Sequence, residues 1–152
     1  MKMKFLPPSE HLERCLEMID RTNQFNISGK RYARDEFERL LGADAHFCWS
    51  FQDYFGDYGI VGYLRATGHD GHWTVTDFVM SCRVAEKRVE EALFHALWDR
   101  LPSPVESISI QLVKTDRNDA IVKKLAQLGS KDSSGLVTLN PDLKSWDVVE
   151  IV

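Results

Sequence analysis

Hydrophobic residues largely alternate with polar ones over residues 73–80 and then recur at intervals of three and four over residues 89–101. The first spacing is that of a β-strand and the second that of an amphipathic helix. Between them, residues 81–88 include three cations and no proline. Where a strand leads into a helix, unpaired N–H groups and the positive end of the helix dipole meet, so this junction is a candidate anion site. The alternative is a helix start that binds only water.

The same two periodicities predict the remaining elements. In chain order these are helices over residues 9–23 and 32–41, strands over 45–54, 58–66 and 73–80, a helix over 89–101, a strand over 105–113, a helix that ends at Gly129, and strands over 135–140 and 146–152. Short turns join the first three strands, which predicts an antiparallel meander. The helix between the third and fourth strands predicts a right-handed crossover and a parallel pair. This order, ααβββαβαββ, is an α+β fold.

Composition limits the class of protein. The 152 residues are 43% hydrophobic and 28% charged, with no linker long enough to divide them, so we expect a single domain over residues 1–152. The net charge of −4 argues against a nucleic-acid partner. No apolar run reaches the roughly 20 residues that span a bilayer, and the N-terminus does not read as a signal peptide. Three scattered cysteines fit free thiols in a reducing cytoplasm.

The order of elements resembles the GNAT acyltransferase fold, and three stretches resemble one branch of it. They are RTNQFN (residues 21–26), FGDYGIVG (55–62) and MSCRV (80–84) followed by VEEAL (89–93). These are similar to the C-terminal GNAT-like region of FkbH-like proteins over about residues 12–129. That family carries a HAD-type phosphatase region before this part and prepares glyceryl-type thioesters on an acyl carrier protein. No D-x-D-x-T/V phosphatase motif occurs in this sequence.

The resemblance implies where an acyl thioester would bind. In GNAT enzymes the acyl-CoA pyrophosphate lies on the turn before the central helix, and the pantetheine arm lies between the fourth and fifth strands. The residues that this implies for binding are Met80, Ser81, Cys82, Arg83, Val84, Lys87, Arg88 and Asn118. Asn118 matches the asparagine that contacts the pantetheine arm; the alternative is that it caps the last helix.

Residues 85–90 of this sequence depart from the acyl-CoA loop pattern of that family. The loop reads Q/R-x-x-G-x-G/A because glycine lets backbone amides close on the pyrophosphate. Here Arg88 and Glu90 take the glycine positions, and no glycine occurs between His72 and Leu128. Phosphate binding would then depend on the side chains of Lys87 and Arg88. The tyrosine that protonates the leaving thiolate in the family falls at Leu125, which has no proton to give.

Two residues are candidates for catalysis. Cys82 follows the central strand beside a cation and a helix start, surroundings that favour a nucleophile or a transient thioester; the alternative is a small core residue. Asp57, with Asp53, flanks the first hairpin where GNAT enzymes place a general base; the alternative is a turn former. Cys15 and Cys48 fall on apolar faces and are expected in the core. His69 and His72 are not expected to bind a metal.

Two functions remain open on the sequence alone. The first is an acyltransferase with no tightly bound cofactor, whose substrate is an acyl-CoA or a phosphopantetheine thioester on an acyl carrier protein. The second is a non-catalytic module that docks an acyl carrier protein or a HAD-type partner. Cations at Arg83, Lys87 and Arg88 suit an acidic carrier in either case. Asn23, Gln24 and Asn26 would edge the acceptor side of the cleft, or simply end the first helix.

Overall fold

A mixed sheet of eight strands runs through the computed structural model, which describes residues 1–142 and 149–152. Across the sheet the order is β6-β7-β5-β4-β3-β2-β1-β8. The strands are β1 (Lys2–Leu6), β2 (Ala45–Asp53), β3 (Gly56–His69), β4 (His72–Met80), β5 (Ser107–Gln111), β6 (Gly129–Lys131), β7 (Leu136–Leu139) and β8 (Glu150–Ile151). The predicted antiparallel meander of β2, β3 and β4 is confirmed, and so is the parallel pair of β4 and β5.

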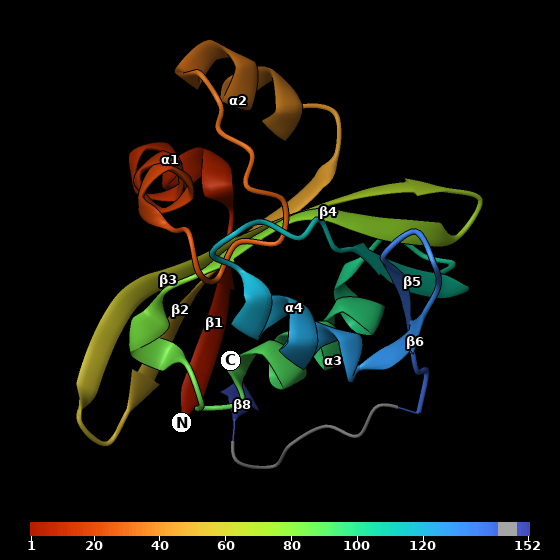
Figure 1. The fold of residues 1–152 in the computed structure, drawn as a ribbon. Helices are drawn as coiled ribbons and strands as arrows, with labels where there is room; N and C mark the ends of the chain where they lie inside the picture. Colours follow the sequence, from red (N-terminus) through yellow and green to blue (C-terminus); the bar gives the residue numbers. More distant parts are fainter. Residues whose placement is uncertain (143–148) are drawn as a thin grey trace.

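Helices cover both faces of this sheet (Figure 1). They are α1 (Leu12–Arg21), α2 (Arg34–Leu41), α3 (Val89–Arg100) and α4 (Asp119–Ala126), with short 3-10 helices η1 (Pro8–Glu10) and η2 (Cys82–Val84). The helices α3 and α4 pack on one face, and α1 and α2 lie on the other side. The predicted α+β class, a mixed and mostly antiparallel sheet flanked by helices, is confirmed.

The C-terminal end of β4, residues 78–80, is apolar on both faces, and helices pack against each of them. Phe78 and Met80 belong to the larger core beneath α3 and α4, whereas Val79 belongs to the smaller core beneath α1. The helix α3 buries most of its residues, and its predicted start at Val89 is confirmed. The strand and the helix on either side of residues 81–88 are therefore both fixed by core packing.

Several boundaries differ from the sequence-based expectation. The first long helix begins at Leu12 instead of residue 9, because η1 comes before it. The β2–β3 turn lies at Tyr54 and Phe55, so Gly56 already belongs to β3. The sequence does not predict β1 or β6, which have five and three residues and are too short for a clear periodicity.

The C-terminal expectation is tested only in part. Of the strand expected at residues 146–152, residues 146–148 lie outside the described residues, and β8 is its described part, parallel to β1. Among the described residues, no helix combines the length and the apolar character needed to cross a membrane.

Candidate functional site

The parallel strands β4 and β5 separate at the edge where β4 leads into η2. They pair only from His72 and Ser107 to Val75 and Ile110. Beyond that point the remaining half of β4 has no β5 partner. This is the gap in which the sequence-based prediction expects a pantetheine arm.

The gap is filled by the protein's own backbone. The amide of Met80 donates to the carbonyl of Phe25 at 3.0 Å, and the amide of Ile27 donates to the carbonyl of Phe78 at 3.2 Å. On the other side, the amide of Val113 donates to the carbonyl of Ile27 at 2.9 Å. The segment between α1 and α2 thus acts as a short inserted strand. The expectation of an open cleft between the fourth and fifth strands is wrong, because these amides and carbonyls are already paired.

Asn118 holds this inserted segment in place. Its side chain is fully buried, and its Nδ2 donates to the carbonyls of Asn26 and Val113 at 2.8 and 2.9 Å. Its Oδ1 accepts from the amide of Thr115 at 2.8 Å. Asn118 stands at the residue before α4, yet its side chain makes no capping bond to that helix. The cap interpretation is therefore wrong for the side chain, and both donor hydrogens that would contact a pantetheine arm serve the chain itself.

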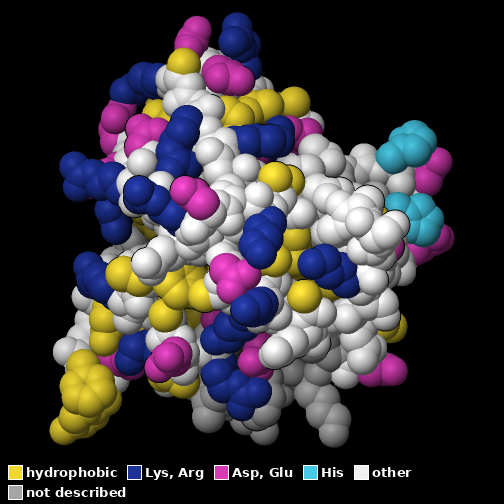
Figure 2. All heavy atoms as spheres, in the orientation of Figure 1, with side chains coloured by type: hydrophobic (Ala, Val, Ile, Leu, Met, Phe, Trp, Pro, Cys, Tyr) yellow, Lys and Arg dark blue, Asp and Glu magenta, His cyan; other side chains and the backbone are white. Residues whose placement is uncertain are grey.

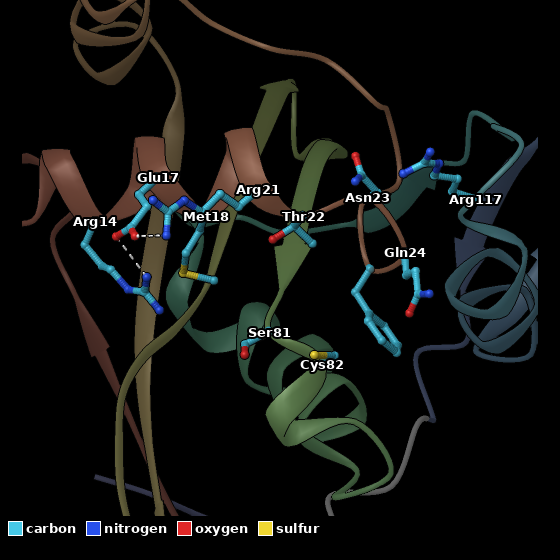
Figure 3. A pocket seen from close by; sticks show the side chains of 11 residues that line it. Arg14, Glu17, Met18, Arg21, Thr22, Asn23, Gln24, Ser81, Cys82 and Arg117 are labelled. Atoms are coloured by element: carbon cyan, nitrogen blue, oxygen red, sulfur yellow. Dashed lines mark hydrogen bonds and ion pairs between the residues drawn. The ribbon is translucent and has the colours of Figure 1, made fainter.

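Beside the filled gap lies an open cavity of about 400 Å³, between α1, the segment that follows it and the start of η2 (Figure 3). It is lined by Arg14, Glu17, Met18, Arg21, Thr22, Asn23, Gln24, Phe25, Ser81, Cys82 and Arg117. Ser81 and Cys82 lie across it from α1, and Arg117 reaches its far side near Asn23 (Figure 3).

Cys82 is an exposed thiol, unlike the other two cysteines. It is the first residue of η2, and it lines the cavity. The preceding Ser81 accepts a hydrogen bond at its hydroxyl from the Arg83 amide at 3.3 Å, which turns the chain at the end of β4. The alternative of a buried core residue is wrong for Cys82, whereas Cys15 and Cys48 are buried as expected.

Positive charge dominates the cavity. Glu17 pairs with both Arg14, at 3.1 Å, and Arg21, at 2.9 Å. Arg117 adds a third guanidinium, which makes no hydrogen bond or ion pair within residues 1–142 and 149–152. Figure 2 shows this as Lys and Arg side chains at the borders of an exposed hydrophobic area below α1. The cavity can therefore accept an anionic group next to an apolar one.

Two residues of the junction between β4 and α3 take a backbone conformation that favours glycine, and one of them, Arg88, is an expected glycine position. The other expected glycine position, Glu90, lies in α3. Glu86 and Arg88 have φ values of 65° and 60°, in the left-handed region that favours glycine. Arg88 stands at the residue before α3 and pairs with Glu91 at 2.8 Å. The glycine position that the sequence assigned to Arg88 is therefore a position that needs a positive φ.

The other cations of the junction are turned toward neighbours in the fold. The ammonium group of Lys87 bonds the Asp53 carboxylate at 2.7 Å, and the Arg83 guanidinium donates to the Tyr58 carbonyl at 3.4 Å. The Lys87 hydrogen bond lowers the pKa of Asp53 below its ordinary value. These contacts tie the junction to the β2–β3 hairpin. The phosphate-binding role predicted for Lys87 and Arg88 stays a prediction, and it would require both to leave their present partners.

A carboxylate lies at the start of α3 itself. Glu90 is fully buried in the first turn and pairs with Lys124 of α4. An acidic side chain here compensates the positive end of the helix dipole, which reduces the attraction for an external phosphate.

Asp57 lies apart from this cavity. It is exposed on the hairpin, and its Oδ1 accepts from the Gly59 amide at 2.8 Å, as a turn former does. Its predicted role as a base stays a prediction. Leu125 is buried in the core. Within the described residues, no cluster of three or more His, Cys, Asp or Glu side chains is arranged to hold a metal.

The arginines of the cavity were not among the residues predicted for the site from the sequence. Arg14, Glu17 and Arg21 are spaced three and four residues apart, so the helical period alone puts them on one face of α1. Arg117 comes from the connection between β5 and α4 and carries no local signal. Only the fold brings it to α1.

Solved structures share this fold. The ribosomal-protein-S18-alanine N-acetyltransferase from Escherichia coli is 12% identical, over 82% of this chain and 73% of its own, with a TM-score of 0.59. Ard1 from Thermoplasma volcanium is 14% identical, over 90% and 93%, with a TM-score of 0.58. The protein smu.2055 from Streptococcus mutans UA159 is 14% identical, over 91% and 96%, with a TM-score of 0.60. No family model and no curated protein matches the sequence. At these identities the likeness establishes the fold, which is the GNAT fold.

Proposed function

We propose that this protein is an acyltransferase of the GNAT fold that takes an acyl group from a phosphopantetheine thioester onto Cys82. The observation that carries the proposal is the exposed thiol of Cys82 in a positively charged cavity at the end of β4. The stretches that resemble FkbH-like proteins support it, since residues 21–25, 81 and 82 line that cavity. The resemblance to that family favours a glyceryl-type thioester on an acyl carrier protein as the donor, and acyl-CoA is the alternative donor.

The proposed chemistry is a thioester exchange. The Cys82 thiol loses its proton, its sulfur attacks the thioester carbonyl carbon, and the bond from that carbon to the pantetheine sulfur breaks. Pantetheine leaves as a thiolate and takes up one proton, so the step balances without oxidation. An incoming nucleophile then attacks the new thioester and restores the thiol. Holding the thioester against Cys82 would supply the main rate advantage.

The test is acylation of the intact protein. Purified protein is incubated with acetyl-CoA and, separately, with an acetyl-loaded acyl carrier protein, and its mass is measured. We expect one acyl group, located on the Cys82 peptide and absent from Cys82→Ala. The buried Cys15 and Cys48 serve as internal controls and should stay unmodified. Acylation at another residue, or none from either donor, contradicts the proposal.

A second function is favoured by the filled gap. Because the inserted segment at Phe25 and Ile27 occupies the place of a pantetheine arm, the fold would also suit a non-catalytic module that docks an acyl carrier protein or a HAD-type partner. Saturable binding of the carrier protein to both wild type and Cys82→Ala, with no acyl transfer to Cys82, would support this function over the first.

A further inference from the structure

We infer that Arg117 is the anion-recognition residue of this cavity and binds a phosphate or carboxylate of the thioester substrate. The inference rests on the proposed function and deepens it. Two parts of the substrate can carry that charge: the phosphate of the phosphopantetheine arm, or an anionic acyl group. Either way, the charged group would approach through the open side of the cavity, and not along the gap between β4 and β5.

The backbone at Arg117 is fixed. Its amide donates to the Thr115 hydroxyl at 3.2 Å, and the next residue is Asn118, whose buried side chain bonds three separate backbone groups. The guanidinium therefore extends from a rigid base, which lowers the entropic cost of fixing it on a ligand.

The other cations near Cys82 are engaged with acidic groups or carbonyls. Glu17 is shared by Arg14 and Arg21, and Lys87 bonds Asp53. Arg117 lines the same cavity, and within the described part of the chain its guanidinium has no acidic or carbonyl partner. A planar guanidinium in this state can bind a phosphate or carboxylate through two parallel hydrogen bonds.

The usual phosphate site of this fold, the start of α3, already has a negative charge next to it. At the start of α3, the buried Glu90 carboxylate already faces the helix dipole and pairs with Lys124. The inserted segment occupies the gap between β4 and β5. Arg117, by contrast, lines the open cavity together with Cys82.

The experiment separates the two sources of charge. Binding is measured by calorimetry to Cys82→Ala, which cannot accept an acyl group, with a matched set of thioesters: butyryl or succinyl on pantetheine, and the same acyl groups on 4′-phosphopantetheine. The measurements are repeated after adding Arg117→Gln. The control is Arg39→Gln, an exposed arginine on α2 outside the cavity.

Loss of one charged hydrogen-bonded contact should weaken binding by about 10- to 100-fold. We expect Arg117→Gln to do so only for compounds that carry the recognised charge: both phosphopantetheine compounds if the arm is the source, or both succinyl compounds if the acyl group is. Arg39→Gln should change nothing. Equal weakening of all compounds by Arg117→Gln, or no weakening of any, overturns the inference.

Acyl transfer to Cys82 is measured in parallel on the wild type and on Arg117→Gln with Cys82 intact, and it distinguishes the two claims. Charge-selective binding that depends on Arg117, without acylation of Cys82, would leave the inference standing and refute the transferase. Acylation of Cys82 that is indifferent to Arg117 would do the reverse.

Discussion

Asn118 shows how much one buried amide decides in this site. It bonds the carbonyls of Asn26 and Val113 and the amide of Thr115, so it joins the segment that follows α1 to the connection between β5 and α4 beside the cavity. If this buried amide were removed, the carbonyls that it bonds would have no donor, which would cost free energy of folding. The same side chain therefore holds the segment that fills the gap between β4 and β5, and it fixes the backbone that carries Arg117.

Replacement of Asn118 tests this. We expect Asn118→Ala to lower the free energy of unfolding by about 2–4 kcal/mol, since it leaves buried carbonyls unpaired. Urea unfolding followed by circular dichroism measures the change. The control is Asn140→Ala, an exposed asparagine whose Oδ1 accepts from the Asp142 amide, and it should change stability by less than about 0.5 kcal/mol. Equal changes in the free energy of unfolding for the two variants would show that the hydrogen bonds of Asn118 do not stabilise the fold.

Arg88 carries backbone strain that can be isolated. Its φ of 60° suits glycine, because a Cβ is crowded in the left-handed region. Arg88→Gly and Arg88→Ala lose the same contact with Glu91, but only glycine relieves the strain. We expect Arg88→Gly to be more stable than Arg88→Ala by about 0.5–1 kcal/mol in thermal or urea unfolding. An alanine variant as stable as the glycine variant would mean that this residue is not strained.

At the scale of elements, the β2–β3 hairpin supports the junction between β4 and α3. Asp53 on the hairpin bonds Lys87 on the junction, and Arg83 bonds the hairpin at Tyr58. The hairpin tip extends past these contacts, with Tyr54 and Phe55 97% and 83% exposed. A long-range ion pair, between Lys87 and Asp53, thus positions the junction. In an acyl-CoA loop the same stretch would contain glycines that let the backbone amides close on the pyrophosphate.

This link should depend on pH. The pKa of Asp53 is depressed in the folded protein by the Lys87 hydrogen bond, so the carboxylate stabilises the link above its ordinary pKa of 3.8, and the link is lost as the pH falls through the lower folded value. We expect the amides of residues 85–88 to be protected from hydrogen exchange, relative to their intrinsic rates, at neutral pH and to lose that protection as the pH falls below 3.8. Lys87→Met should show the reduced protection already at neutral pH.

The control for that experiment is Asp57→Asn. Asp57 is a carboxylate of the same hairpin that contacts the Gly59 amide and not the junction. Its replacement should leave exchange in residues 85–88 unchanged. An effect as large as that of Lys87→Met would mean that hairpin charge in general, and not the ion pair, holds the junction.

At the scale of the whole molecule, two cores on opposite faces of the sheet depend on one another through β2, β3 and β4. Tyr63 and Val79 belong to the smaller core, and their neighbours Leu64 and Phe78 belong to the larger one. Buried polar groups join the sheet to the segment before α2: Asp77 accepts from Tyr32 at 2.7 Å. Loss of either core should therefore unfold both.

Global stability should fall on mild acidification because of His46. Burial lowers the pKa of His46 below its ordinary value of 6.5, with Asp44 and Arg65 as the nearby charges. The unfolded chain then binds a proton that the folded protein resists, so the free energy of unfolding decreases as the pH drops through 6.5. We expect the urea midpoint to fall between pH 7.5 and about pH 5.5, and His46→Gln to reduce that fall. If the urea midpoint of His46→Gln falls with pH as much as that of the wild type, other groups cause the loss of stability.

The sequence by itself determined the order of elements around residues 73–101. It did so because the meander, the parallel crossover and the start of α3 at Val89 each follow from the spacing of apolar residues within one segment. The resemblance to the GNAT acyl-CoA loop also aligned Arg88 and Glu90 with glycine positions, and of these two only Arg88 has a positive φ, because Glu90 lies in α3.

The tertiary structure alone decided what fills the gap and what surrounds Cys82. The bond from Asn118 to Asn26 joins residues 92 positions apart, and Lys87 and Asp53 are 34 positions apart. Such contacts leave no periodic trace in the sequence, because they depend on where the sheet brings distant loops together. For the same reason Arg117 carries no signal along the chain, yet the fold places it on the cavity that holds the exposed thiol.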